Sequence, residues 1–217
     1  LLLFGTPEQK AKYLPRLASG ELIACYCLTE PGSGSDAASI KTRAVPTADG
    51  KFYEVTGNKL WITNGGIASY MTVFAKTEVV EGGEKKDKVT CFMVELPTPG
   101  VSVGPSEHKL GLRASWTNAV HFDKVKVPVE NILGGVGKGF KVAMGVLNHG
   151  RLGLAAGSVG IARECLKASV LHANERVQFQ KKLREFGMIQ DKLGTMAVDL
   201  FAAESMVYLT AALTEHG

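Results

Sequence analysis

The hydrophobic pattern of this chain changes period at one glycine-rich segment, and that change constrains the fold class. From residue 22 to about residue 133, short apolar runs alternate with turn residues, as in β-strands. After Gly134–Gly139, apolar residues recur every three to four positions, as in amphipathic helices. We therefore predict a multidomain α+β chain. A central antiparallel β sandwich or barrel at 21–133 follows a helical end at 1–20, and part of an α-helical bundle follows at 134–217, with 134–139 as a flexible joint.

Local signals place several elements. Thr6 to Gln9 has the pattern of a capping box, which predicts a helix from this point. Pro15 predicts that this helix ends near Tyr13. The pair Gly57-Asn58 predicts a turn between two strands, and residues 81–88 predict a polar hairpin tip. The apolar run 71–76 is typical of a strand covered on both faces.

The helical part carries two stripes. An apolar stripe predicts one buried helix face and comprises Ile189, Leu193, Met196, Leu200 and Val207. A glycine stripe comprises Gly150, Gly153, Gly157 and Gly160. Because each interior glycine costs about 1 kcal/mol relative to alanine, the glycine stripe indicates close helix packing, close approach of a ligand, or both.

Composition excludes some classes of function. The net charge is +4, without a stripe of Lys and Arg large enough for nucleic acid. The four cysteines, Cys25, Cys27, Cys91 and Cys165, fit neither a metal site nor a redox motif, and we expect them reduced. We expect no run of the ~20 apolar residues that a membrane span needs. The chain starts without Met on an apolar run, which indicates a piece of something longer.

The stretch Tyr26–Asp36 is the best candidate site. A predicted strand opens into a loop in which Pro31, Gly32 and Gly34 break regular pairing. Glycines let a flat or charged ligand approach the backbone, and nearby Thr and Ser residues supply hydroxyl groups. The loop therefore suits phosphate or ring recognition, although an ordinary Pro-Gly turn explains the glycines equally well.

Three motifs extend this interpretation. The string Leu28-Thr29-Glu30-Pro31-x-x-Gly34-Ser35-Asp36 resembles the signature of acyl-CoA dehydrogenases. Residues 57–66, Gly-Asn-Lys-Leu-Trp-Ile-Thr-Asn-Gly-Gly, resemble the flavin-contacting strand of that family, and residues 110–128 resemble a third segment. All three lie in the family's order. The segments 74–77, 139–144 and 148–151 look closest to the branch that acts on very long acyl chains.

The resemblance implies an FAD site between the β domain and the helical domain, with residues 1–20 as the end of an N-terminal helical domain. Thr29 would hydrogen-bond the flavin ring, and the Thr63 hydroxyl would lie near N5. The isoalloxazine and pyrophosphate would be lined by Tyr26, Cys27, Leu28, Thr29, Glu30, Pro31, Gly32, Ser33, Gly34 and Ser35. The ring edge would contact Trp61, Ile62 and Thr63.

Two further groups follow from the resemblance. Acyl-CoA would be bound by Ser35, Asn148, His149, Gly150 and Arg151. The adenosine half of the FAD in a neighbouring subunit would be reached by Arg176, Gln178 and Phe179. Since the FAD is then shared between subunits, a homodimer or a higher homo-oligomer is implied.

The implied reaction is α,β-dehydrogenation of a long-chain or very-long-chain acyl-CoA to trans-2-enoyl-CoA in fatty acid β-oxidation, with electrons passed to an electron-transfer flavoprotein. The implied catalytic base is a Glu beyond Gly217, or at the position of Gly150 in one branch, and Glu30 would only hold the loop. We therefore expect no catalytic residue, no metal site and no turnover in the 217 residues alone.

Alternatives with the same fold remain open. They are an acyl-CoA oxidase, a respiratory-complex assembly factor and a fragment without flavin. The resemblance implies the mitochondrial matrix or inner membrane for a eukaryotic source and the cytoplasm for a bacterial one. Any peripheral membrane contact would use regions outside this sequence.

Overall fold

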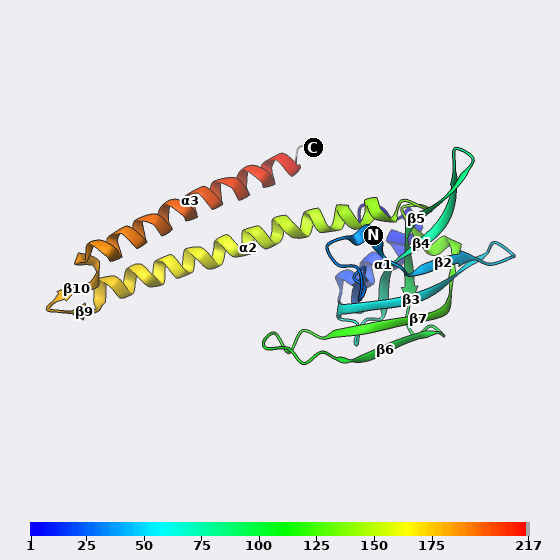
Figure 1. Ribbon diagram of the computed structural model, residues 1–217, viewed down its shortest axis with the longest axis horizontal. Coiled ribbons are helices and arrows are strands. Elements are labelled where there is room, and N and C mark those ends of the chain that lie inside the picture. Colours follow the sequence, from blue (N-terminus) through cyan, green and yellow to red (C-terminus); the bar gives the residue numbers. More distant parts are fainter. Residues whose placement is uncertain (216–217) are drawn as a thin grey trace. The chain divides into compact units, whose positions relative to one another are not determined.

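The computed structural model describes residues 1–215, which form two compact units, the first at 1–144 and the second from residue 145 onward (Figure 1). In the first unit, helix α1 (Pro7–Ala18) precedes a group of strands, and a 3-10 turn, η2 (Val129–Asn131), comes before the last of them. Another 3-10 turn, η1 (Ala37–Ser39), follows the first strand. The strands are β1 (Ala24–Cys27), β2 (Arg43–Pro46), β3 (Phe52–Thr63), β4 (Tyr70–Glu81), β5 (Glu84–Glu95), β6 (Val101–Ser106), β7 (Thr117–Pro128) and β8 (Ile132–Leu133).

The eight strands belong to one hydrogen-bonded sheet in the order β6-β7-β3-β2-β4-β5-β8, with β1 paired to β4 outside this path. Most pairs are antiparallel, but β1 and β2 each pair with β4 in parallel, so the sheet is mixed. One core cluster draws on both halves of the path, with Val120 of β7 and Phe92 of β5 both fully buried in it. The α+β class with a β domain followed by helices is confirmed.

The predicted turn at Gly57-Asn58 is wrong. β3 runs through both residues and pairs with β7 along its length, with register shifts at 55/57 and 59/62. Gly57 instead allows close approach of β2, since a Cβ there would lie 2.7 Å from Thr42 Cα. Strands β2 and β6 were not predicted, because both are short and largely exposed. The hairpin tip at 81–88 and the covered strand at 71–76 are confirmed.

Helix α1 continues five residues beyond its predicted end. The capping box is present, with Gln9 N donating to Thr6 Oγ1 at 3.2 Å and Thr6 N donating to Gln9 Oε1 at 3.0 Å. Pro15 lies inside the helix. Proline cannot donate a backbone hydrogen bond, and tertiary contacts of the helix offset this cost. Tyr13 is buried against Tyr70, and the Gln9 amide donates to the carbonyl oxygens of Glu130 and Ile132.

The glycine-rich segment 134–139 is packed, so its interpretation as a flexible joint is wrong. A Cβ on Gly139 would lie 2.5 Å from the Thr90 carbonyl carbon, and one on Gly134 would lie 2.8 Å from Val142 Cγ2. Helix α2 (Gly139–Glu175) begins here, and the division between the two units falls inside it. The glycines therefore let the chain lie directly on β5.

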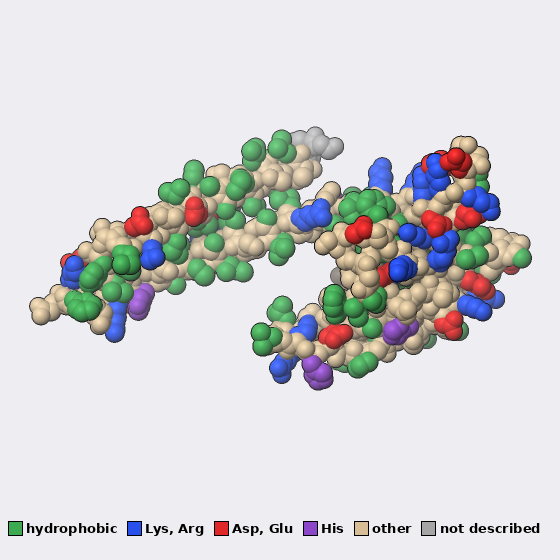
Figure 2. Space-filling view, in the orientation of Figure 1, with side chains coloured by type: hydrophobic (Ala, Val, Ile, Leu, Met, Phe, Trp, Pro, Cys, Tyr) green, Lys and Arg blue, Asp and Glu red, His purple; other side chains and the backbone are tan. Residues whose placement is uncertain are grey.

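The second unit holds most of α2, a hairpin of β9 (Val177–Gln178) and β10 (Lys181–Lys182), the turn η3 (Leu183–Glu185) and helix α3 (Gly187–Glu215). The predicted apolar stripe on α3 is confirmed, since all five of its residues are half-buried. Other apolar residues of α3, including Phe201, Tyr208 and Leu213, are exposed (Figure 2). The glycine stripe of α2 has no neighbour within 4 Å of any added Cβ among the described residues.

The expectation that no segment has the character of a membrane span is wrong for α3. By length and composition, Gly187–Thr214 could cross a membrane, since an 18-residue window within it has a mean hydropathy of 1.4. Two observations favour a packed helix instead. The helix carries the acidic residues Asp199 and Glu204, which are costly in lipid, and Glu204 pairs with Arg163 of α2.

Candidate functional site

The loop between β1 and β2 contains a tight turn at its start. Glu30 N donates to Ser33 O at 2.9 Å, and Ser33 N donates to Glu30 O at 3.1 Å. The Ser33 hydroxyl then donates to Asp36 O at 2.6 Å. These bonds fix residues 30–36 without regular secondary structure, so the loop is a defined surface.

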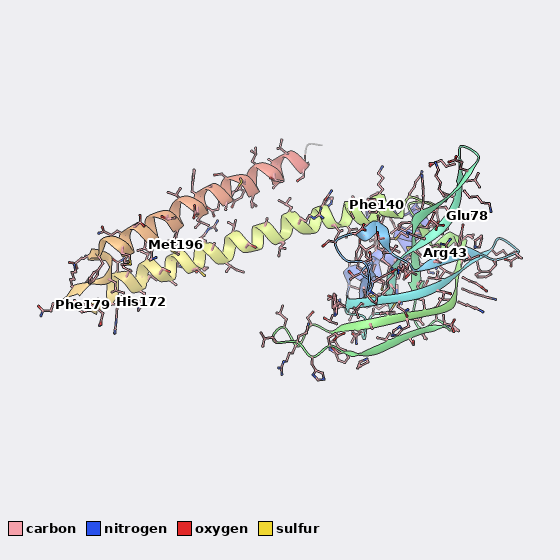
Figure 3. The ribbon with its side chains drawn as sticks, in the orientation of Figure 1. Arg43, Glu78, Phe140, His172, Phe179 and Met196 are labelled. Atoms are coloured by element: carbon pink, nitrogen blue, oxygen red, sulfur yellow. The ribbon has the colours of Figure 1, made fainter. Side chains whose placement is uncertain are left out.

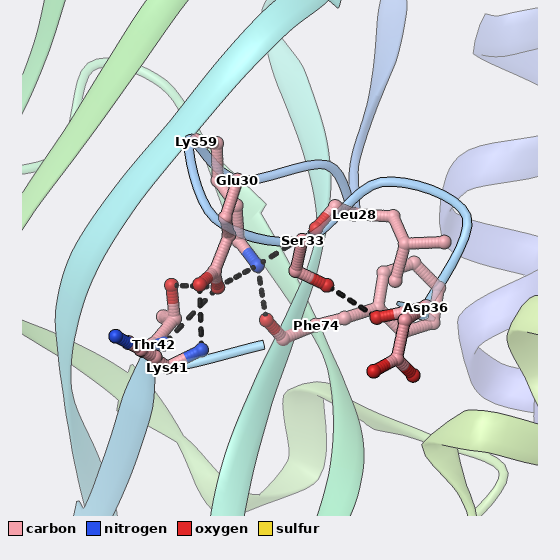
Figure 4. Close-up of polar contacts among 8 residues, drawn as sticks. All are labelled: Leu28, Glu30, Ser33, Asp36, Lys41, Thr42, Lys59 and Phe74. Carbon is pink, nitrogen blue, oxygen red and sulfur yellow. Dashed lines mark hydrogen bonds and ion pairs between the residues drawn. The ribbon is translucent and has the colours of Figure 1, made fainter. Parts of the chain in front are cut away.

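A buried ion pair holds this loop from beneath (Figure 4). Lys59 of β3 is fully buried, and its Nζ lies 2.8 Å from Glu30 Oε1. The same Nζ donates to Phe74 O at 2.7 Å and to Leu28 O at 3.2 Å. The Glu30 carboxylate also accepts from Lys41 N at 2.5 Å, and from the N–H and hydroxyl of Thr42 at 3.0 and 2.6 Å.

The pKa directions agree with a charged pair. Burial by itself would raise the pKa of Glu30, but hydrogen bonds from Lys59, Thr42 and Lys41 N outweigh it and hold that pKa below its usual value. Burial lowers the pKa of Lys59, and Glu30 offsets part of this effect. Every hydrogen bond to the Glu30 carboxylate favours its charged form. Glu30 therefore has a structural role in this loop. Its predicted role in holding the loop agrees with these contacts.

The end of β3 forms the second part of the site. Trp61 adopts a left-handed φ of 55° at the bulge between 59 and 62, and it is 62% exposed. Such a conformation is uncommon for a bulky residue and is a reason to look for function. Leu60 N donates to Thr29 O at 3.0 Å, so the loop and the bulge lie side by side. The neighbouring Thr63 is exposed.

The structure separates the predicted contact residues into two groups. Some are exposed or half-exposed residues, namely Tyr26, Thr29, Pro31, Gly32, Gly34, Ser35, Trp61 and Thr63. Others have buried side chains, namely Cys27, Leu28, Glu30, Ser33 and Ile62. Ile62 belongs to the core cluster, so its side chain faces away from the surface that Trp61 occupies, and only its backbone is available there. Tyr26 is half-buried, with its hydroxyl donating to Ala143 O at 3.3 Å.

The loop offers unused donors. Within residues 1–215, no acceptor receives the N–H groups of Gly32, Gly34 or Ser35. An added Cβ on Gly32 or Gly34 would meet nothing within 4 Å, so a ligand can approach the backbone closely. Free N–H groups close together in one loop suit an anion such as a pyrophosphate, and the exposed Trp61 suits a flat ring. The residues present therefore fit a dinucleotide that combines the two.

The second unit holds the remaining predicted residues. Asn148, His149, Gly150 and Arg151 are exposed near the start of this unit. Arg151 Nη1 donates to Asn148 Oδ1 at 2.9 Å, and His149 Nδ1 lies 2.8 Å from Gly145 O. Asn148 and Arg151 also border an open groove of about 640 Å³ between α2 and α3, whose other lining residues are mostly apolar.

The hairpin at 177–182 presents Phe179 outward (Figure 3). Phe179 is 88% exposed with a φ of 50°, and its ring lies 6.4 Å from that of Phe186. Leu183 N donates to Arg176 O at 2.9 Å, which closes the base of the hairpin. The Gln178 amide donates to Val177 O at 2.7 Å. The three predicted residues, Arg176, Gln178 and Phe179, thus lie together on one small element.

Comparison with known proteins assigns these segments. Residues 25–125 match the middle domain of acyl-CoA dehydrogenases, and residues 137–217 match the C-terminal domain. The chain belongs to the acyl-CoA dehydrogenase family. It is 53% identical to the human mitochondrial very long-chain specific acyl-CoA dehydrogenase, over 100% of this chain and 33% of the human protein. The chain therefore spans about a third of that relative.

Two solved acyl-CoA dehydrogenases show the same fold. Butyryl-CoA dehydrogenase from Megasphaera elsdenii is 42% identical, with a TM-score of 0.88 over 100% of this chain and 55% of that one. An acyl-CoA dehydrogenase from Bacillus anthracis, solved with FAD, is 45% identical, with a TM-score of 0.82 over 94% of this chain and 34% of that one.

Sequence reasoning missed Lys59, although it lies inside the second motif. The period-two alternation of β3 gives the signal, since it puts Lys59 on the inward side with Val55, where a Lys needs a partner. Thr42 was missed as well, because nothing in the sequence indicates that β2 approaches Glu30.

Proposed function

We propose that the protein is an FAD-dependent acyl-CoA dehydrogenase that converts long-chain or very-long-chain acyl-CoA to trans-2-enoyl-CoA in fatty acid β-oxidation. The observation that supports this most is the 53% identity to the human very long-chain specific enzyme over the whole chain. The loop and the bulged strand add a physical reason. Free backbone donors and an exposed Trp61 lie together, as a flavin dinucleotide requires.

Removal of two hydrogens from an acyl thioester requires an acceptor for two electrons, and bound FAD would supply this chemistry. The N–H groups of Gly32, Gly34 and Ser35 hold the pyrophosphate. The Thr29 and Thr63 hydroxyl groups orient the ring by hydrogen bonding. Trp61 covers the ring edge and excludes water from it, and Ile62 anchors the strand in the core beneath.

The substrate and the oligomer are part of the same proposal. Arg151 and Asn148 bind the CoA moiety, because a guanidinium pairs two phosphate oxygens at once. Arg176, Gln178 and Phe179 contact the FAD of a partner subunit, which makes the protein a homodimer or a higher homo-oligomer. None of the assigned residues removes the α-proton. Glu30 is excluded from this role, since its carboxylate is fully engaged.

We propose an electron-transfer flavoprotein as the acceptor. The cellular compartment depends on the organism of origin. It is the mitochondrial matrix or inner membrane in a eukaryote and the cytoplasm in a bacterium. One experiment tests the reaction, the chain-length class and the electron acceptor together. The protein, expressed at the full length that its gene encodes, is mixed anaerobically with palmitoyl-CoA or butyryl-CoA, and its flavin absorbance is followed.

The proposal expects bleaching of the flavin by palmitoyl-CoA at a lower concentration than by butyryl-CoA. It also expects slow reoxidation in air and fast reoxidation by an electron-transfer flavoprotein. Absence of bleaching by both thioesters would overturn the dehydrogenase assignment. Preference for butyryl-CoA would overturn the chain-length class, and rapid reoxidation by air would favour an oxidase.

A further inference from the structure

Lys59 connects three separate segments through one ammonium group. Its Nζ donates to Leu28 O in the loop, to the Glu30 carboxylate, and to Phe74 O in β4. Lys59 itself belongs to β3, at the edge of the bulge that turns Trp61 outward. A single rigid contact point therefore sets the spacing between the loop and the bulged strand.

Glu30 extends this connection to a fourth segment. Its two carboxylate oxygens accept from the N–H groups of Lys41 and Thr42, directly before β2, while Lys59 reaches it from β3. The far end of the loop is thereby tied to the same charge as its near end. Figure 4 shows these bonds converging on the one carboxylate.

Stability alone does not require such a pair. A buried ion pair is often no more stabilising than well-packed apolar side chains of similar volume, because desolvation offsets the attraction. What the pair adds is direction, since the carboxylate accepts several donors at fixed angles. Apolar side chains would fill the same space without fixing where residues 28–30 lie relative to residues 60–63.

We propose that Lys59 and Glu30 are positioning residues for the flavin site, setting the distance between the N–H groups of the loop and the exposed face of Trp61 and Thr63. This inference rests on the proposed function, since it names how that site is held. Neither side chain touches the FAD. Both act through Thr29, whose carbonyl accepts from Leu60 N at 3.0 Å next to Lys59.

The test uses the full-length protein with three variants, Lys59→Met, Glu30→Gln and the double variant. Removing one charge leaves the other buried and unpaired, so each single variant loses stability as well as position. The double variant removes both charges and regains stability, but it does not regain the hydrogen bonds that Lys59 donates to Leu28 O, Glu30 and Phe74 O. It therefore separates a positioning role from a structural one.

A matched control is Thr77→Val. Thr77 is buried in the same sheet, and its hydroxyl bonds with Thr90 Oγ1 at 2.6 Å and Lys88 O at 3.2 Å rather than with the loop. The readouts are the dissociation constant of FAD from fluorescence quenching, the visible absorption of the bound flavin, and hydrogen exchange of the Leu60 N–H in the FAD-free protein. Exchange reports the loop contact without any flavin.

In the double variant we expect near wild-type stability, FAD binding weaker by about tenfold, which is about 1.4 kcal/mol, and faster Leu60 exchange. The control should lose stability with unchanged FAD affinity. A double variant with wild-type FAD affinity and wild-type exchange would overturn the positioning role. Failure of the wild-type protein to bind FAD would instead overturn the proposed function, so the two failures are distinguishable.

Discussion

The ammonium group of Lys59 lies 2.8 Å from the carboxylate of Glu30, with Lys59 fully buried and Glu30 only 6% exposed. This pair joins the loop after β1 to the middle of β3, which are the two segments that form the candidate flavin site.

Loss of one partner of the pair should be costly. Lys59→Met leaves the Glu30 carboxylate buried without its cation, and we expect a loss of about 3–5 kcal/mol in the free energy of unfolding. The double variant Lys59→Met/Glu30→Gln should lose much less. Urea unfolding followed by circular dichroism measures both, and a double variant as unstable as the single would contradict this account.

The contribution of Glu30 should depend on pH. Its pKa in the folded protein lies below the usual value of about 4.3, so the folded state binds its proton more weakly than the unfolded state. The stabilisation is therefore present above that usual value and is lost as the pH falls through the lower folded pKa. The stability difference between wild type and Glu30→Gln, measured by urea midpoints from neutral to acid pH, should shrink in that window. A difference that grows toward acid pH would be inconsistent with the charged pair.

Gly57 should not tolerate a side chain. In Gly57→Ala, the added Cβ would lie 2.4 Å from Thr42 Oγ1, which is the group that donates to Glu30. We expect a loss of about 1–3 kcal/mol in the free energy of unfolding. Gly111→Ala is the matched control, since its Cβ would meet nothing within 4 Å, and it should be nearly neutral. Thermal unfolding compares the two, and equal losses would refute the steric explanation.

Trp61 should report FAD binding directly. The chain has two tryptophans, Trp61 and Trp116, so Trp116→Phe leaves Trp61 as the single emitter within these residues. We expect FAD to quench the emission of this variant more strongly than that of Trp61→Phe, because Trp61 follows Leu60, whose N–H donates to Thr29 O in the loop, whereas the Trp116 carbonyl accepts from Asn64 N beyond the bulge. If the emission of Trp61→Phe were quenched as strongly or more strongly, FAD would bind away from the bulge. Trp61→Phe should keep wild-type stability to within about 0.5 kcal/mol, since the Trp61 side chain is largely exposed.

The sequence predicts the class and much of the order of elements, and the reasons for its errors are local. The apolar stripe from Ile189 to Val207 gives the buried face of α3, because helical period and burial coincide there. The C-terminal end of α1 and the turn at Gly57-Asn58 were misjudged, since burial of Tyr13 and the approach of Thr42 are tertiary effects that propensity does not contain.

The candidate site shows the same division. The loop and Trp61 could be found from the family motifs, and Glu30 could be assigned to structure. The side-chain direction of Ile62 required the strand register, because the bulge between 59 and 62 changes which residues face inward. A pattern of letters does not locate such a bulge.

The most direct test of the central claim is an experimental structure of the full-length protein with FAD bound. The account predicts the isoalloxazine ring in van der Waals contact with Trp61, within hydrogen-bonding distance of Thr29 and Thr63, and the pyrophosphate on the N–H groups of Gly32, Gly34 and Ser35. An FAD bound elsewhere, with Trp61 and this loop left in solvent, would contradict it.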